Sequence, residues 1–110
     1  MTSNRVEESV PIRPALRTRF GYMFGHPGLQ DSMPAWWVPR FTDLCGEIDA
    51  ILGTDKRGFH WRQLKEKLGT GRYYWSLTPW DLSQHPTALV DAIQTAIKAA
   101  DADLYPASAR

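Results

Sequence analysis

Hydrophobic residues recur at helical spacing in two long stretches of the chain. In the first, apolar side chains follow one another every three or four residues, a periodicity that predicts an amphipathic helix. This helix should begin near Trp36, because Pro39 is tolerated only where the first backbone N–H groups lack an intrahelical acceptor. Gly53 is placed to cap its C-terminus. Its apolar stripe comprises Trp37, Phe41, Leu44, Cys45, Ile48, Ile51 and Leu52.

The second helix is predicted to begin at Pro86 and to end before Pro106. Just upstream, Thr78, Pro79 and Asp81 have the residue types of an N-cap, a first helical position and an N3 acid, so we expect a helical turn around Trp80. The buried face of the second helix should consist of Leu89, Ala92, Ile93, Ala96, Ile97 and Ala100.

Between the two helices, residues 59–77 are rich in aromatic side chains and contain Gly69 and Gly71 at a natural reversal. This pattern predicts two antiparallel strands. Trp61, Leu64 and Leu68 also fit helical spacing, so the first strand could turn helical before Gly69. We therefore predict an α+β fold of two layers, in which an antiparallel hairpin or small sheet packs against two main α-helices. The other face of the hairpin would then be open to a ligand.

The 110 residues fit one domain. Residues 1–14 mix charges with prolines and should form a mobile arm, residues 15–105 the single α+β domain, and residues 106–110 a frayed tail. Near the start of the domain we expect a short helix or irregular segment that ends at Gly25, Pro27 and Gly28. Its apolar residues are Leu16, Phe20, Tyr22, Met23 and Phe24.

The composition excludes several classes of site. Cys45 is the only cysteine and lies on an apolar helical stripe, so neither a disulfide framework nor a nucleophile is expected. His26, His60 and His85 lie far apart, without carboxylates at metal-ligand spacing. We therefore predict a protein that is not an enzyme and has no metal or cofactor. Because no stretch approaches the roughly 18 apolar residues of a membrane span, we place it in the cytoplasm.

Charge is concentrated in one part of the chain. Residues 55–78 carry six Lys and Arg against two acids, although the whole chain has a net charge of only +1. Cations beside aromatic rings suit nucleotides, because guanidinium and ammonium groups hold phosphate while rings stack on bases. The alternative is that the aromatics are core residues and the cations a solvated face. The candidate ligand-binding residues are Arg62, Lys65, Lys67 and Arg72 for phosphate, Trp61, Tyr73 and Trp75 for stacking, and His60 for a hydrogen bond.

These residues resemble a family of small phage and prophage proteins. The family has a Trp-led helix with Leu-Cys near its middle, followed by a motif close to Gln-Ile-Lys-Glu-Lys-Phe-Gly-x-Leu-Arg-Phe-Tyr. Here the matching residues lie between Leu16 and Trp75, with departures at Leu68 and Gly71, where an aromatic residue and leucine are usual. They are Trp36 or Trp37, Leu44, Cys45, Gln63 to Gly69, and Arg72 to Tyr74.

The resemblance implies a phage accessory protein, and such proteins often act against host defences. It suggests a non-enzymatic counter-defence protein that binds an anionic, nucleotide-like ligand of bacterial immunity through the basic aromatic hairpin. A protein-protein inhibitor of a bacterial defence complex is the alternative, and a single-stranded nucleic-acid binder is the third reading. A homodimer is compatible with each, because an exposed strand edge can pair with its copy.

Overall fold

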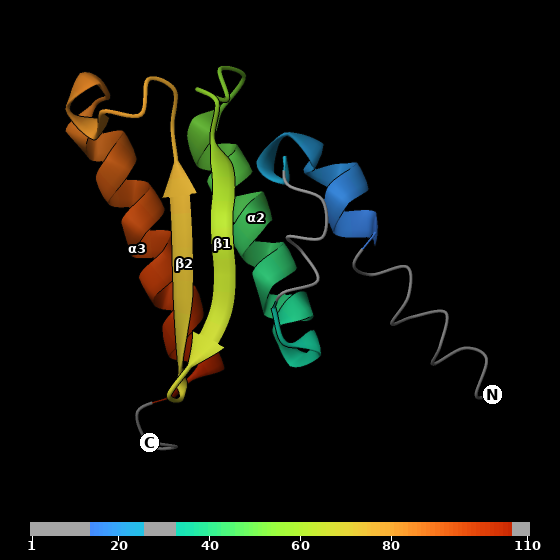
Figure 1. Cartoon of the computed structure of the whole chain (residues 1–110). Helices are drawn as coiled ribbons and strands as arrows, with labels where there is room; N and C mark the ends of the chain where they lie inside the picture. Colours follow the sequence, from blue (N-terminus) through green and yellow to red (C-terminus); the bar gives the residue numbers. More distant parts are fainter. Residues whose placement is uncertain (1–13, 26–32, 107–110) are drawn as a thin grey trace.

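A computed structural model of the protein describes residues 14–25 and 33–106 and shows two layers (Figure 1). Two helices, α2 (Val38–Leu52) and α3 (Thr87–Leu104), lie side by side behind an antiparallel hairpin formed by β1 (His60–Lys67) and β2 (Thr70–Ser76). The predicted α+β fold is confirmed. The predicted arm, tail and turn at Pro27 and Gly28 lie outside the described residues, apart from Pro14 and Pro106.

The helix α2 follows the predicted apolar stripe. A short 3-10 helix, Ala35–Trp37, precedes it, and Pro39 lies within its first two positions. At its end Gly53 has a φ of 71° and donates its N–H to the Asp49 carbonyl at 3.1 Å. The predicted helix is confirmed, and its first turn, from Ala35 to Trp37, is a 3-10 helix rather than an α-helix. Its buried residues are Val38, Phe41, Leu44, Cys45, Ile48 and Leu52.

The helix α3 also follows its prediction, because it starts directly after Pro86 and buries Ile93 and Ala100. The turn that precedes it lies elsewhere than expected. It is a 3-10 helix at Leu82–Gln84, and Asp81 rather than Thr78 caps it. The Asp81 carboxylate accepts hydrogen bonds from the backbone N–H and the hydroxyl of Ser83 at 3.0 and 2.8 Å. The turn begins after Asp81 because the Asp81 side chain can accept a hydrogen bond from the N–H two residues later, at Ser83.

An extra residue in β1 explains why the sequence also fitted a helix. The register pairs Trp61 with Trp75 and Gln63 with Tyr74, so Arg62 is the additional residue of a β-bulge. Trp61 and Leu64, three residues apart, consequently both face the core. β1 remains a strand up to Lys67, and the alternative of a helical end is therefore wrong.

The hairpin turns through two residues, both with positive φ. Leu68 has a φ of 54° and Gly69 a φ of 75°, the backbone signature of a type I′ turn. The expected place of Gly71 in the reversal is wrong, since it lies in β2. A Cβ atom there would lie 2.2 Å from the Tyr73 hydroxyl, so glycine is needed for space rather than for the turn.

Leu68 is an unfavourable residue for its position, because its side chain is 89% exposed and its backbone is left-handed. We expect Leu68→Asn to raise the free energy of unfolding by about 1 kcal/mol, since asparagine tolerates this conformation in type I′ turns. Urea denaturation measures the change. Leu68→Ala is the control, because it removes the exposed side chain but not the strain. Equal stabilities of the two variants would contradict the explanation.

The N-terminal segment packs onto α2. Residues 14–19 are helical, Gly21–Met23 forms a 3-10 helix, and Leu16, Phe20, Met23 and Phe24 are buried. The Phe24 and Phe41 rings meet edge to face at 6.3 Å. The Tyr22 hydroxyl donates to Asp49 at 2.6 Å. The prediction of a short helical or irregular segment is confirmed for the described residues.

Polar groups join the inner face of the hairpin to the helices. The Tyr105 hydroxyl accepts a hydrogen bond from the Trp37 indole at 2.9 Å and donates one to Glu66 at 2.7 Å. The Asp101 carboxylate accepts bonds from the Tyr73 hydroxyl at 2.9 Å and from the Gly71 N–H at 3.2 Å. Burial, and then the bond to Glu66, raises the pKa of Tyr105 to about 12. These bonds fix which side of the hairpin lies on the helices.

Candidate functional site

The open side of the hairpin is built from the outward positions of both strands. The bulge turns two consecutive residues of β1 outward, and alternate residues of β2 join them. We call this surface the outer face. It consists of His60, Arg62, Gln63, Lys65, Lys67, Thr70, Arg72, Tyr74 and Ser76.

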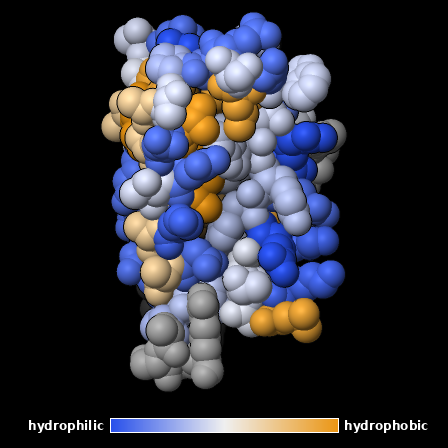
Figure 2. Space-filling model, turned by 90° about the vertical axis from the view of Figure 1, so that its left-hand side faces the viewer, coloured by the Kyte–Doolittle hydropathy of each residue, from blue (hydrophilic) through white to orange (hydrophobic). Residues whose placement is uncertain are grey.

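All four predicted phosphate-binding cations lie on the outer face, and it carries no carboxylate. Lys65 and Arg72 are directly opposite one another across the two strands. Glu66, the only acid of the hairpin, faces inward and accepts the bond from Tyr105. None of the four cations forms an ion pair with another residue in the described part of the chain. The right-hand edge of Figure 2, where this face is seen in profile, is mostly hydrophilic, with one hydrophobic group at its lower end.

The predicted stacking residues lie on the other side. Trp61 is 0% exposed, with its ring centroid 5.1 Å from that of Phe41, so its predicted contact with a ligand is wrong. Tyr73 stacks on Trp37 at 5.1 Å, and burial together with its bond to Asp101 raises the pKa of its phenol. Trp75 also faces inward and stacks on Phe59, but it is half-buried and borders the hollow described below, so its contact with a ligand stays a prediction. These rings hold the two layers together.

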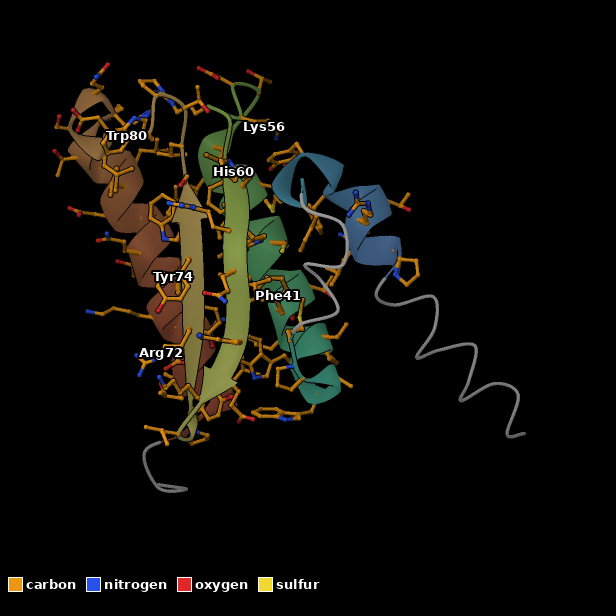
Figure 3. The ribbon with its side chains drawn as sticks, in the orientation of Figure 1. Phe41, Lys56, His60, Arg72, Tyr74 and Trp80 are labelled. Carbon is orange, nitrogen blue, oxygen red and sulfur yellow. The ribbon has the colours of Figure 1, made fainter. Side chains whose placement is uncertain are left out.

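Two aromatic residues missed by the sequence prediction are accessible instead. Tyr74 is 48% exposed and lies on the outer face, and Trp80 is 82% exposed in the loop after β2. Figure 3 shows His60 and Tyr74 along the strands, with Trp80 above them and Arg72 toward the turn. Strand alternation could have identified Tyr74, because it separates Tyr74 from Tyr73 and Trp75. No local pattern marks Trp80.

A hollow of about 730 Å³ lies where the outer face meets the loop of Trp80. This volume is within the range of small-molecule sites, about 300–1,000 Å³. His60 is held in it by a 2.9 Å hydrogen bond between its Nδ1 and the Gly58 carbonyl. The residues around the hollow include His60, Arg62, Trp75, Ser76, Trp80 and Leu82.

The loop that carries Trp80 is held by His85, whose side chain is buried. Its Nε2 lies 2.8 Å from the Pro79 carbonyl, and its Nδ1 lies 3.3 Å from a nitrogen of the Arg57 guanidinium. Both contacts are satisfied when Nε2 donates to the carbonyl and Nδ1 accepts from the guanidinium. The Thr78 N–H also donates to the Arg57 carbonyl at 2.7 Å. Trp80 consequently projects from an anchored loop.

Other kinds of chemistry receive little support from the described residues. Burial raises the pKa of the Cys45 thiol to about 12, so it is unsuited to act as a nucleophile at neutral pH. No three His, Cys, Asp or Glu side chains among residues 14–25 and 33–106 come together in a way that could hold a metal. None of the helices described is both long and apolar enough to cross a membrane.

The outer face and its adjoining hollow are therefore the candidate site: four cations, two exposed aromatic rings and a histidine on the hairpin and on the loop that follows it. Comparison of the chain with models of protein families, with curated proteins and with solved structures gave no match.

Proposed function

We propose that the protein binds an anionic, nucleotide-like ligand on the outer face of its hairpin and does not transform it. The observation that carries this proposal is the cross-strand pair Lys65 and Arg72, two like charges directly opposite each other. Such a pair destabilises a sheet when it is left alone. A bound phosphate group would neutralise both charges at once, because each can donate to its oxygens.

The surroundings of this pair favour a phosphate ligand over a single acidic side chain. Arg62 and Lys67 add two more cations to the same face, so the local field attracts multiply charged anions. Tyr74 lies next to Arg72 on this face, and Trp80 adjoins the hollow with Arg62. Exposed rings beside phosphate-binding cations provide stacking surfaces that inorganic phosphate does not use. A nucleotide would use both, with its phosphates on the cations and its base on an aromatic ring.

Arg72→Glu tests the proposal because its two expected effects have opposite signs. In the free protein it replaces a repulsive pair by an attractive one, so the free energy of unfolding should rise by about 0.2–1 kcal/mol. Binding should weaken by at least about tenfold, because one charge-assisted contact is lost. Thermal denaturation gives the first quantity. Titration with ATP, cyclic di-AMP and tripolyphosphate gives the second.

The matched control for Arg72→Glu is Lys98→Glu, which makes the same change of net charge on the exposed side of α3. It should weaken the binding of the three probes only as far as the lower net charge of the protein does so, and therefore much less than Arg72→Glu. The proposal fails if the wild-type protein binds none of the probes. It also fails if Lys98→Glu weakens binding as much as Arg72→Glu does.

The resemblance to phage and prophage proteins supplies the biological setting of the proposal, in which the ligand is a nucleotide signal of host immunity and binding removes it from its receptor. In that role the ligand should be recovered intact. Cyclic di-AMP incubated with the protein and released by denaturation should therefore show no hydrolysis by chromatography. Turnover that exceeds the buffer control would contradict the non-enzymatic part of the proposal.

A further inference from the structure

The cations on the outer face form a row rather than a ring around one point. Arg62, Lys65 and Lys67 follow one another along β1, with Arg72 beside Lys65 on β2. Lys65 and Lys67 are alternate residues of β1 and therefore lie about 6.8 Å apart, comparable with the separation of neighbouring phosphates in an extended nucleic-acid strand. Arg62 lies further along the strand, at the bulge. The row therefore matches a linear series of phosphates better than the compact phosphate group of a mononucleotide.

The exposed aromatic rings follow the same direction. Trp80 adjoins the hollow at the end where Arg62 lies, and Tyr74 lies further along the face, opposite Gln63. A single nucleotide has one base and would leave one ring without a partner. Successive bases of one strand would reach both, with phosphates between them on the cations.

Resting on the proposed function, we infer that the outer face binds single-stranded nucleic acid. One base occupies the hollow beside Trp80, a following base stacks on Tyr74, and the phosphates run over Arg62, the Lys65 and Arg72 pair, and Lys67. A duplex fits less well: a two-stranded ribbon can enter its major groove, but paired bases present only their edges there and offer no ring face to Trp80 or Tyr74. Contacts to ring faces and phosphates predict tolerance of base sequence.

Fluorescence polarisation with a labelled oligothymidylate tests this inference. The oligonucleotide should bind at least about tenfold more tightly than ATP, because its contacts are linked along one chain. The logarithm of its association constant should fall linearly with the logarithm of the salt concentration. The expected slope is about −2 to −3, because each of three or four phosphate contacts contributes about −0.7. An unlabelled duplex of the same length should compete poorly.

Alanine variants of the two rings separate stacking from charge. Tyr74→Ala and Trp80→Ala should each weaken oligothymidylate binding by about 5- to 150-fold and leave tripolyphosphate binding unchanged. Trp36→Ala is the control, because Trp36 is 52% exposed but packs against Tyr105 outside the outer face. It should bind oligothymidylate like the wild type.

Equal affinity for ATP and oligothymidylate, equal affinity for the duplex, or wild-type binding by both ring variants would each overturn the inference. In those cases binding of ATP or tripolyphosphate would leave the proposed function standing. If oligothymidylate, ATP, cyclic di-AMP and tripolyphosphate all fail to bind, the proposed function fails as well.

Discussion

Trp61→Ala should lower the free energy of unfolding by about 3–5 kcal/mol, the usual cost of removing a large aromatic side chain from a core. The Trp61 side chain is fully buried, with ring centroids 5.1 Å from Phe41 and 5.2 Å from Phe59. Its loss would leave a cavity between α2 and the hairpin. Small domains have stabilities of about 5–15 kcal/mol, so this one substitution removes a large share. Urea denaturation followed by circular dichroism measures it.

The control is Tyr74→Ala, an aromatic truncation on the opposite face of the same hairpin. Tyr74 is 48% exposed, so its removal should change the stability by no more than about 0.5 kcal/mol. Trp61→Phe should cost much less than alanine. The indole N–H of Trp61 is buried without a hydrogen-bond partner among the described residues, and phenylalanine omits that group while filling most of the space. Similar losses for Trp61→Ala and Tyr74→Ala would contradict the assignment of the two faces.

Gly58→Ala should lower the free energy of unfolding by about 2–5 kcal/mol, which combines left-handed backbone strain with steric overlap. Gly58 has a φ of 66°, and a Cβ atom there would lie 2.3 Å from the Thr78 hydroxyl oxygen and 2.6 Å from its Cβ. The loop after β2 would have to move away, and the hollow beside Trp80 would change shape with it. Thermal denaturation should show the loss of stability.

Gly69→Ala separates the two causes, because Gly69 has a φ of 75° but nothing within 4 Å of the added Cβ. It should cost only about 1–2 kcal/mol. Thr78→Gly removes the two side-chain atoms that lie closest to the added Cβ, so the double variant should recover most of the steric part of the loss in a double-mutant cycle. If Gly58→Ala costs no more than Gly69→Ala, the close packing of the two loops is not what requires glycine.

Local periodicity was sufficient to predict the helices. The apolar stripes of α2 and α3 are set by spacing along one helix, and the cap at Gly53 by the backbone freedom of one residue. The two-layer arrangement followed because a hairpin needs an apolar cover. Each of these inferences depends on residues close together in the chain.

Which residues of β1 lie on which face of the hairpin could not be predicted without knowing how the two strands pair. The bulge at Arg62 shows itself only in the register of β1 against β2, and without it Trp61 and Leu64 appear to belong to opposite faces. The cations could be identified from composition alone, and Tyr74 from the alternation of residues along β2, but Trp80 could not be identified in either way. Trp80 owes its exposure to loop contacts of Arg57 and His85, residues distant in sequence from each other.

Because β1 has one extra residue between Trp61 and Leu64, it should tolerate the deletion of one residue at this point. In a regular strand, the loss of one residue turns every side chain beyond it to the other face. Here the loss of Arg62 or Gln63 would restore simple alternation, with Trp61 and Leu64 still pointing inward. Variants shortened at this point would keep the same core and differ in how many polar side chains they display. Deletion of one residue at this point, as well as substitution, would thus adjust the charge of the surface while the fold of the domain is kept.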